Sequence, residues 1–143
     1  KAKGNAKSTN IGSNERLKPM LFRKFIEKGL LRGELEQHEA STYLYRQGDK
    51  AENFFLILAG SINLTDAQEN ITTPVTAPPD LLLAVVDLMN DRYSHTATVR
   101  DKTSLIRISK TELMKTLQHN ALLRLYMLKQ LSRQEVLSKP SFE

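Results

Sequence analysis

The densest β pattern in the chain lies between residues 43 and 64. Tyrosine alternates with leucine at its start, a polar turn centred on Gly48 and Asp49 follows, and residues 54–58 form a continuous apolar run. Apolar residues at every second position, and short apolar runs rich in aromatic and branched residues, are typical of strands. Because Gly60 marks a second turn, the stretch predicts three strands joined by two turns.

A helix is predicted ahead of these strands. From Asn14 to about Lys28, apolar side chains recur at three- and four-residue spacing, as on one face of a helix. Gly29 and Gly33 interrupt this pattern and end the helix. The leucines that follow, through Leu35, are assigned to a second short turn, and the whole segment to a lid on the β core.

The middle of the chain has a weaker pattern. Residues 65–80 lose apolar density and contain three prolines, which cannot donate to a β ladder. They predict a loop with at most one short edge strand, at residues 71–75. Residues 81–89 form a second apolar block, whose periodicity fits a buried strand and a short buried helix equally.

Two further strands are predicted before the chain becomes helical. In residues 93–100, His95 and Ala97 share one face of an alternating strand. A polar turn at residues 101–104 then leads to a last strand at residues 105–108.

Two helices are predicted at the C-terminal end. Ser109 and Glu112 have the spacing of a capping box, and Asn120 can cap a second helix that runs to about Leu137 and is ended by Pro140. The second helix carries more apolar surface than one packed face needs, so we expect part of it to contact a partner or a second copy of the chain. The predicted interface residues are Leu122, Leu125, Leu128 and Leu131.

Length and composition fit one domain of the α+β class, mainly β. The chain has 143 residues, of which 40% are hydrophobic, enough to bury a core. The pattern predicts a small antiparallel β-roll or jelly roll flanked by an N-terminal helical segment and two C-terminal helices. The domain would span residues 14–138, between a disordered basic tail at residues 1–13 and a C-terminal tail at residues 139–143.

Charge and cysteine content change this picture little. The net charge of +5 comes partly from the basic tail, and elsewhere Lys and Arg are interleaved with Asp and Glu, so no nucleic-acid face is expected within this piece. The chain has no cysteine, which excludes disulfides and thiolate chemistry, and no apolar run of the roughly 20 residues that cross a bilayer. We expect a cytoplasmic location, as a soluble domain that can belong to a larger or membrane-bound protein.

The order of these elements and the sequence of residues 43–64 carry a family resemblance. This stretch resembles the first half of the cyclic nucleotide-binding domain in three parts: Tyr-Leu-Tyr-Arg-Gln-Gly-Asp, the apolar run, and Ala-Gly-Ser-Ile-Asn-Leu. Gly48 and Gly60 stand at that family's turn glycines. Residues 95–109 resemble its later strands, and the two C-terminal helices resemble its B and C helices. The resemblance covers roughly residues 15–138 and implies a regulatory fold.

The sequence departs from the resemblance at the family's ligand cassette. In ligand-binding members, a Gly-Glu pair lies about nine residues before an Arg-Ala-Ala-Thr-Val run; backbone amides and the arginine hold the cyclic phosphate, and the glutamate binds the ribose hydroxyl. Here His95 stands at the arginine position and Val85-Val86 at the Gly-Glu pair. Valine cannot accept the ribose hydrogen bond, and neutral histidine substitutes poorly for a bidentate guanidinium. We therefore expect a scaffold that has lost canonical cyclic AMP and cyclic GMP binding and needs no cofactor.

A divergent ligand site is the alternative. Asp87 would replace the glutamate and Arg92 or Arg100 the arginine, with His95 and Thr96 beside them, to bind a cyclic mono- or dinucleotide. On the competing interpretation, Asp87 and Arg92 are surface charges, Arg100 is an exposed strand residue and apolar side chains fill the pocket. The candidate filling residues are Leu82, Val85, Val86 and Leu88.

Catalysis and metal binding find no support in the sequence. His38, His95 and His119 are far apart, and neither a Gly-x-Ser-x-Gly elbow nor a glycine-rich phosphate loop occurs. We expect a module that is not an enzyme and has no catalytic residues and no metal site. It would act on a protein partner or on other domains of the parent chain, with a homodimer through the last helix as one form of that contact.

Overall fold

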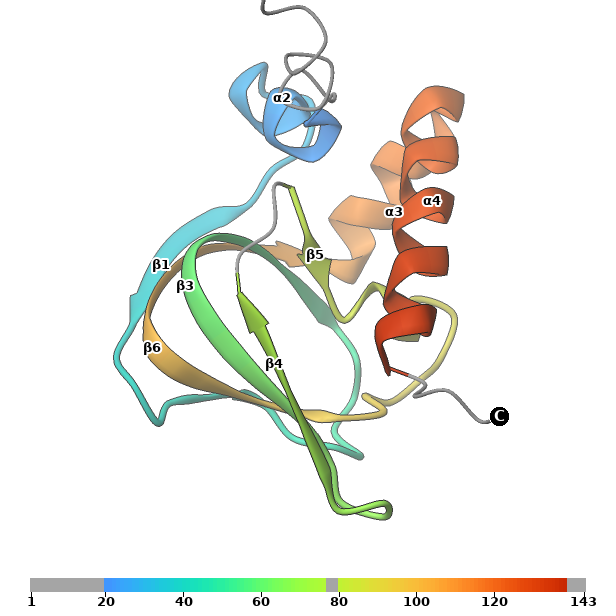
Figure 1. Ribbon diagram of the computed structural model, residues 1–143. Coiled ribbons are helices and arrows are strands. Elements are labelled where there is room, and N and C mark those ends of the chain that lie inside the picture. Colours follow the sequence, from blue (N-terminus) through green and yellow to red (C-terminus); the bar gives the residue numbers. More distant parts are fainter. Residues whose placement is uncertain (1–19, 77–79, 139–143) are drawn as a thin grey trace, which may run out of the picture.

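The computed structural model describes residues 20–76 and 80–138, with the side chains of the last helix described as far as Ser132. Six strands form one antiparallel sheet that curls into a roll, and three α-helices lie outside it (Figure 1). The predicted α+β, mainly β class is therefore confirmed. The elements are α2 (Leu21–Glu27), β1 (Glu34–His38), β2 (Tyr43–Tyr45), β3 (Asn53–Asp66), β4 (Ile71–Thr76), β5 (Leu82–Leu83), a 3-10 helix (Val85–Asp87), β6 (Thr96–Ser109), α3 (Lys110–Gln118) and α4 (Ala121–Ser138).

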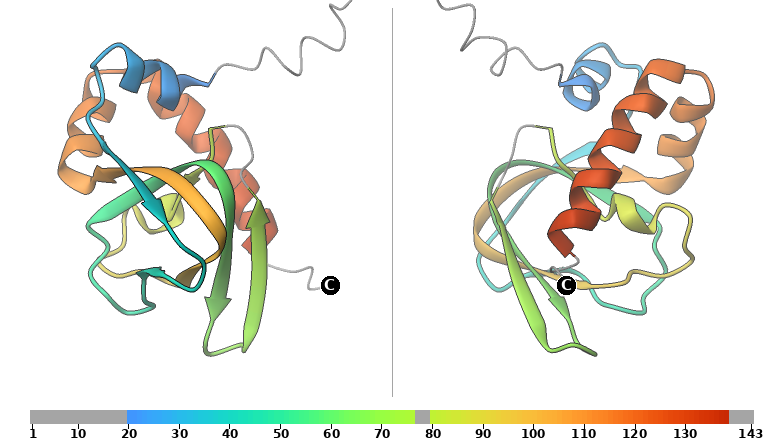
Figure 2. Two further views of the ribbon diagram at one scale, coloured as in Figure 1. Left: turned by 90° about the vertical axis from the view of Figure 1, so that its left-hand side faces the viewer. Right: turned by 45° about the vertical axis from the view of Figure 1, so that its right-hand side comes forward.

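The pairing of β3 with β6 forms the centre of the sheet. Each strand has 14 residues, and their register runs from Asn53 opposite Ser109 to Thr65 opposite Thr96. β1 lies beside β6 and β4 beside β3, while β2 pairs with β6 and β5 with β3. The β3–β4 hairpin projects from the end of the roll that is farther from α2 (Figure 2).

Two predicted turns are bends within these long strands, which corrects the sequence-based division. The register of β3 against β6 shifts between Ile57 and Ile62, around Gly60, whose φ is 109°. Extra residues at such shifts let a strand bend and twist without leaving its ladder. The second predicted turn, at residues 101–104, lies inside β6 for the same reason.

The helix ends were mostly predicted correctly from local sequence signals. α2 ends at Glu27 with Lys28 as its C-cap, and Gly29 follows with a φ of 75°. The Ser109 hydroxyl accepts a hydrogen bond from the Glu112 amide at 3.1 Å, which confirms half of the capping box. The Glu112 carboxylate accepts instead from the Arg32 amide at 3.3 Å.

One local prediction was wrong. Leu35 lies in strand β1 rather than in a helical turn, and its side chain is 69% exposed. Asn120 directly precedes α4, and its carbonyl accepts from the Arg124 amide at 3.1 Å, while its side-chain nitrogen donates to the Thr116 carbonyl at the end of α3, at 2.8 Å. The predicted edge strand at residues 71–75, by contrast, is confirmed as β4. The helix start at Asn14, the stop at Pro140 and the two tails lie outside the described residues.

The core fills the roll and continues under the helices. Phe54 and Phe55 of β3 are buried, as are Leu105 and Ile108 of β6. The Tyr45 ring, also buried, stacks against the Tyr93 ring with centroids 3.9 Å apart. None of the described helices is long and apolar enough to cross a membrane.

Replacing Gly60 with alanine should lower the free energy of unfolding by about 2 to 4 kcal/mol, measured by urea denaturation. A Cβ at this position would meet Thr103 Oγ1 and lie 2.6 Å from the Lys102 carbonyl oxygen, in addition to the strain of a φ of 109°. Gly48→Ala is the matched control, because Gly48 also has a positive φ, 92°, but a Cβ there meets nothing within 4 Å. We expect the control to cost about 1 kcal/mol; equal losses in the two variants would contradict the packing at the bend.

Candidate functional site

The segment between β5 and β6 occupies the place of the predicted ligand cassette. Leu82 and Leu83 pair with Leu56 and Phe55 of β3, and a single turn of 3-10 helix follows. The apolar block at residues 81–89 is thus a short strand and then a short helix, the two alternatives that its periodicity left open. α4 lies against this 3-10 helix.

Ala84 marks the start of the 3-10 helix in the cassette segment. It has a φ of 75°, the left-handed conformation that favours glycine, and it immediately precedes that helix. Val85 is fully buried and Val86 lines the pocket, so the two residues at the predicted Gly-Glu pair place apolar side chains in the core and in the pocket wall.

Asp87 is a structural carboxylate of the cassette loop. It is 1% exposed, so it is not the surface charge of the competing interpretation. One oxygen accepts from the Ser94 amide at 3.0 Å and the Ser94 hydroxyl at 3.2 Å, and the other accepts from the Asn90 side-chain amide at 3.0 Å. Because three donors of its own loop already use this carboxylate, a ligand hydroxyl would have to displace one of them.

The two candidate arginines do not reach the cassette pocket. Arg92 is exposed and donates from Nη1 to the Gly48 carbonyl at 2.9 Å. Arg100 is an exposed residue of β6. Thr96 accepts a hydrogen bond from the Gln47 amide at 2.9 Å.

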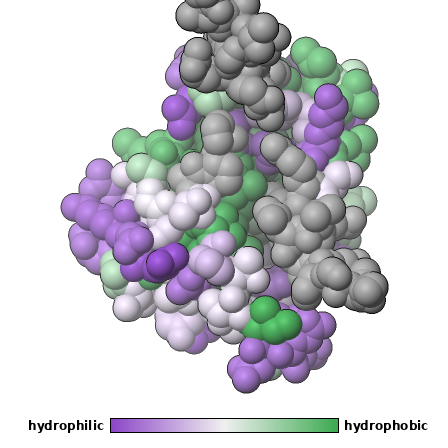
Figure 3. Space-filling model, in the orientation of Figure 1, coloured by the Kyte–Doolittle hydropathy of each residue, from purple (hydrophilic) through white to green (hydrophobic). Residues whose placement is uncertain are grey.

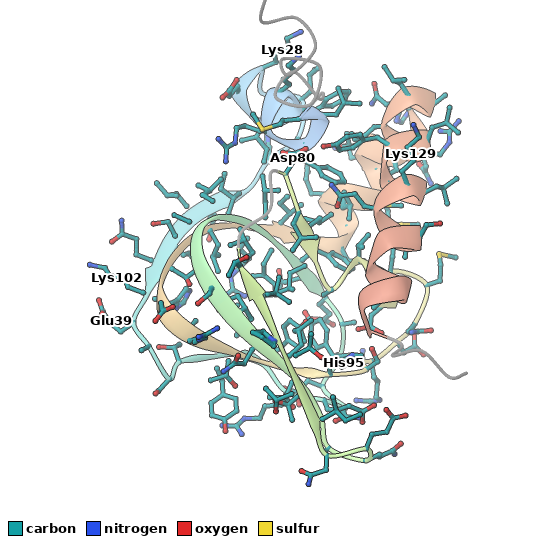
Figure 4. The ribbon with its side chains drawn as sticks, viewed as in Figure 1. Lys28, Glu39, Asp80, His95, Lys102 and Lys129 are labelled. Atoms are coloured by element: carbon teal, nitrogen blue, oxygen red, sulfur yellow. The ribbon has the colours of Figure 1, made fainter. Side chains whose placement is uncertain are left out.

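The three histidines lie on separate parts of the fold. His95 is half-buried at the pocket, and its Nδ1 lies 2.9 Å from the Ser94 hydroxyl (Figure 4). His38 on β1 lies 2.9 Å from Glu36, and His119 after α3 lies 3.0 Å from the Lys115 carbonyl. Within residues 20–76 and 80–138, no three His, Cys, Asp or Glu side chains gather as metal ligands do.

The pocket itself is small and mostly apolar. Its cavity measures about 40 Å³, whereas sites for small molecules typically measure about 300 to 1,000 Å³. Burial raises the pKa of Tyr45 in its wall well above the usual value, and the charge of Asp87 raises it further, so the phenol stays neutral. Neither lysine nor arginine is among the described residues that line it, which are Tyr45, Leu64, Thr73, Val75, Leu81, Leu83, Ala84, Val86, Asp87 and His95.

The sequence analysis missed the wall of the pocket on the β-sheet side. Leu64, Thr73 and Val75 come from the β3–β4 hairpin, and Tyr45 comes from β2. The alternation of apolar residues along these strands was the available signal, but it does not show which face of the sheet meets the cassette. Of the five predicted ligand residues, the structure brings Asp87 and His95 to the pocket wall, with Thr96 next in the chain.

The outer face of α4 is the second candidate surface. Leu122, Leu125 and Leu128 are 66%, 60% and 55% exposed, whereas Leu123 is buried on the opposite face. Apolar atoms gather over the upper end of α4 in the space-filling view (Figure 3). Leu131, the fourth predicted interface residue, is half-buried and packs against the core instead, because it lies on the inner side of the helix.

Comparison with protein families gives one match. The model of the cyclic nucleotide-binding domain matches residues 35–120, from the second residue of β1 to the residue before α4. No curated protein matches the chain.

Solved structures share the fold at low sequence identity. The sensor domain of the transcriptional regulator DNR from Pseudomonas aeruginosa superposes with a TM-score of 0.63 at 19% identity, covering 96% of this chain and 100% of that one. The catabolite activator protein of Thermus thermophilus gives a TM-score of 0.64 at 15% identity, with 82% of this chain and 55% of that chain covered. The c-di-GMP-responsive global regulator of Xanthomonas campestris gives 0.58 at 18% identity, covering 79% and 62%. The chain thus spans little more than half of these two regulators.

Asp87→Ala should lower the free energy of unfolding by about 2 to 3 kcal/mol, because it removes the buried carboxylate that accepts from half-buried Ser94 and from the Asn90 side chain. Asp91→Ala removes an exposed carboxylate from the same loop and should change stability by less than about 0.5 kcal/mol. Thermal or urea unfolding measures both. A loss in Asp87→Ala no larger than in the control would show that the carboxylate does not hold the loop.

Proposed function

The chain belongs to the cyclic nucleotide-binding domain family, and we propose that it is a non-catalytic regulatory module that has lost the canonical site for cyclic AMP and cyclic GMP. The observation that carries the proposal is the cassette wall. Val86 lines the pocket where the resemblance puts the family's glutamate, and half-buried His95 stands at the position of the arginine. The family's two ligand-holding side chains are thus replaced together.

Electrostatics at the pocket disfavour a cyclic phosphate. A phosphate diester carries a negative charge that must be paired with a cation or with several donors once water is removed. The described pocket wall holds the carboxylate of Asp87, which would repel an anion, and neither Arg92 nor Arg100 lines the pocket. The His95 ring cannot match the bidentate contact of a guanidinium, and its Nδ1 already lies 2.9 Å from the Ser94 hydroxyl.

The outer face of α4 would carry the output of the module. Three leucines at a spacing of three residues leave an apolar stripe on a helix whose inner face is already packed. Exposed apolar stripes of this kind mark contacts with other protein surfaces. We propose that a second copy of the chain covers the stripe, helix against helix. The similar structure from Pseudomonas aeruginosa supports a sensor role, since it is the sensor domain of a transcriptional regulator.

Isothermal titration calorimetry should detect no binding of cyclic AMP, cyclic GMP or cyclic di-GMP at micromolar concentrations. A retained divergent site would instead give micromolar affinity that is lost in Arg92→Ala or Arg100→Ala, because the charge of the phosphate needs a cation. Lys102→Ala is the control, since Lys102 is an exposed cation of the same strand as Arg100. Binding that the two arginine variants abolish and the control retains would contradict the loss of the site.

Light scattering should give the mass of a dimer for the wild-type chain and of a monomer for the Leu125→Glu, Leu128→Lys double variant. Two charges on the stripe leave unpaired ions in the apolar contact, which costs several kcal/mol. Leu35→Glu changes an equally exposed leucine on β1 and should remain a dimer. A wild-type monomer, or a double variant with unchanged mass, would contradict pairing through α4.

A further inference from the structure

A buried carboxylate, Asp80, joins three segments that are distant in the sequence. Asp80 is 1% exposed and lies two residues before β5, the strand that leads into the cassette. Its Oδ2 accepts from the Phe22 amide at 2.8 Å and from the Tyr126 hydroxyl at 2.7 Å, and its Oδ1 accepts from the Arg23 amide at 3.0 Å. The carboxylate therefore contacts both α2 and α4. Figure 4 shows Asp80 beside α2, well separated from His95 at the other end of the cassette segment.

On the α2 side, Asp80 supplies a cap that the helix itself lacks. α2 has seven residues, its N-cap residue is Met20 without a side-chain cap, and its first turn holds no acidic residue. A helix this short is unstable alone, because its first amides lack partners and nucleation is costly. The carboxylate satisfies two of these amides, and its charge is favourable at a helix N-terminus. α2 thus depends on a residue 58 positions away for its cap.

On the α4 side, two inner-face residues hold the same segment. Tyr126 and Gln130 are four residues apart and so lie on one face of the helix. The Gln130 side chain, 2% exposed, donates to the Asp80 carbonyl at 2.5 Å and accepts from the Leu82 amide at 3.1 Å. The Tyr126 ring also packs edge-on against Phe22, with centroids 5.3 Å apart. α4 therefore fixes both the carboxylate that caps α2 and the start of β5.

The Tyr126 hydroxyl is suited to act as a donor at any physiological pH. Burial raises its pKa, and its hydrogen bond to Asp80 and the charge of that carboxylate raise it further. The phenol thus stays protonated and donates to Asp80. If α4 moved away, the buried carboxylate would lose one of its three donors, and a charged acceptor left short of donors is costly.

We propose that Asp80 is a positioning residue that couples the seating of α4 to the capping of α2, so that a second copy bound to the outer face of α4 stabilises α2. This inference rests on the proposed pairing through Leu122, Leu125 and Leu128. Tyr126 lies one helical turn after Leu122 and directly after Leu125, on the flank between the stripe and the inner face, so a copy that holds the stripe also holds Tyr126 against Asp80. The coupling is reciprocal: a change that loosens α2 also weakens the seating of α4 and its pairing.

Hydrogen exchange of single amides, followed by NMR, tests the coupling. Tyr126→Phe removes the hydroxyl and keeps the ring against Phe22, and the amides of Phe22 and Arg23 should then exchange about tenfold faster. The increase should exceed any change in the β3–β6 ladder, which reports global stability. Tyr43→Phe removes the same group from a tyrosine that is 50% exposed on β2 and should leave both amides unchanged.

The outcomes separate the coupling from the pairing. Faster exchange along α4 with unchanged rates at Phe22 and Arg23 would show that Tyr126 merely anchors its own helix, and would overturn the proposal. In the monomeric Leu125→Glu, Leu128→Lys variant these two amides should exchange faster than in the dimer, and Tyr126→Phe should abolish that difference. A wild-type chain that is monomeric by light scattering, yet responds to Tyr126→Phe at α2, would overturn the pairing and leave the Asp80 coupling standing.

Discussion

The antiparallel pairing of β3 with β6 is the constraint on which the rest of the structure depends. Two 14-residue strands remain in one ladder from Asn53 opposite Ser109 to Thr65 opposite Thr96, and they bend together where their register shifts. Every other strand attaches to one member of this pair. β5, which pairs with β3, leads into the cassette, and α3 begins where β6 ends and is followed by α4. The β3–β6 pair therefore positions both the pocket and the C-terminal helices.

The residues of the cassette segment differ from the glycine, glutamate and arginine that the family resemblance implies at the ligand site. Ala84 has the left-handed backbone conformation that favours glycine, directly before the 3-10 helix. Val85 is packed into the core, and both oxygens of Asp87 accept hydrogen bonds from Ser94 and Asn90. A second buried carboxylate, Asp80, lies where α2, β5 and α4 meet. We propose that the regulatory contacts of the module lie at that junction and at the exposed leucines of α4.

Local sequence signals predicted the features that depend on neighbouring residues. The serine cap of α3, the stop of α2 before Gly29 and the edge strand with Pro74 all follow from residues within one turn of each other. The bend at Gly60 was misread as a turn, since a glycine with positive φ serves a turn and a bulge alike. Leu35 was misassigned because β1 has no buried apolar face: its residues are exposed or half-buried.

The long-range contacts of the site could not be predicted in this way. Asp80 meets residues 58 positions before it and 46 positions after it, and it lies at the edge of a proline-rich stretch that sequence analysis assigns to a loop. The left-handed conformation of Ala84 could not be predicted either, because the apolar block at residues 81–89 has no glycine to mark it. By contrast, the exposure of Leu122, Leu125 and Leu128 followed directly from an excess of leucine over what one packed face needs.

Methyl-resolved NMR of the pocket walls tests the central claim most directly. The methyl groups of Leu64, Val75, Leu83 and Val86 surround the cavity from both the hairpin and the cassette. During a titration with cyclic AMP into the millimolar range, a module without the canonical site predicts that these signals keep their positions. Saturable shifts of the same methyl groups would show that the nucleotide enters the pocket and would contradict the account.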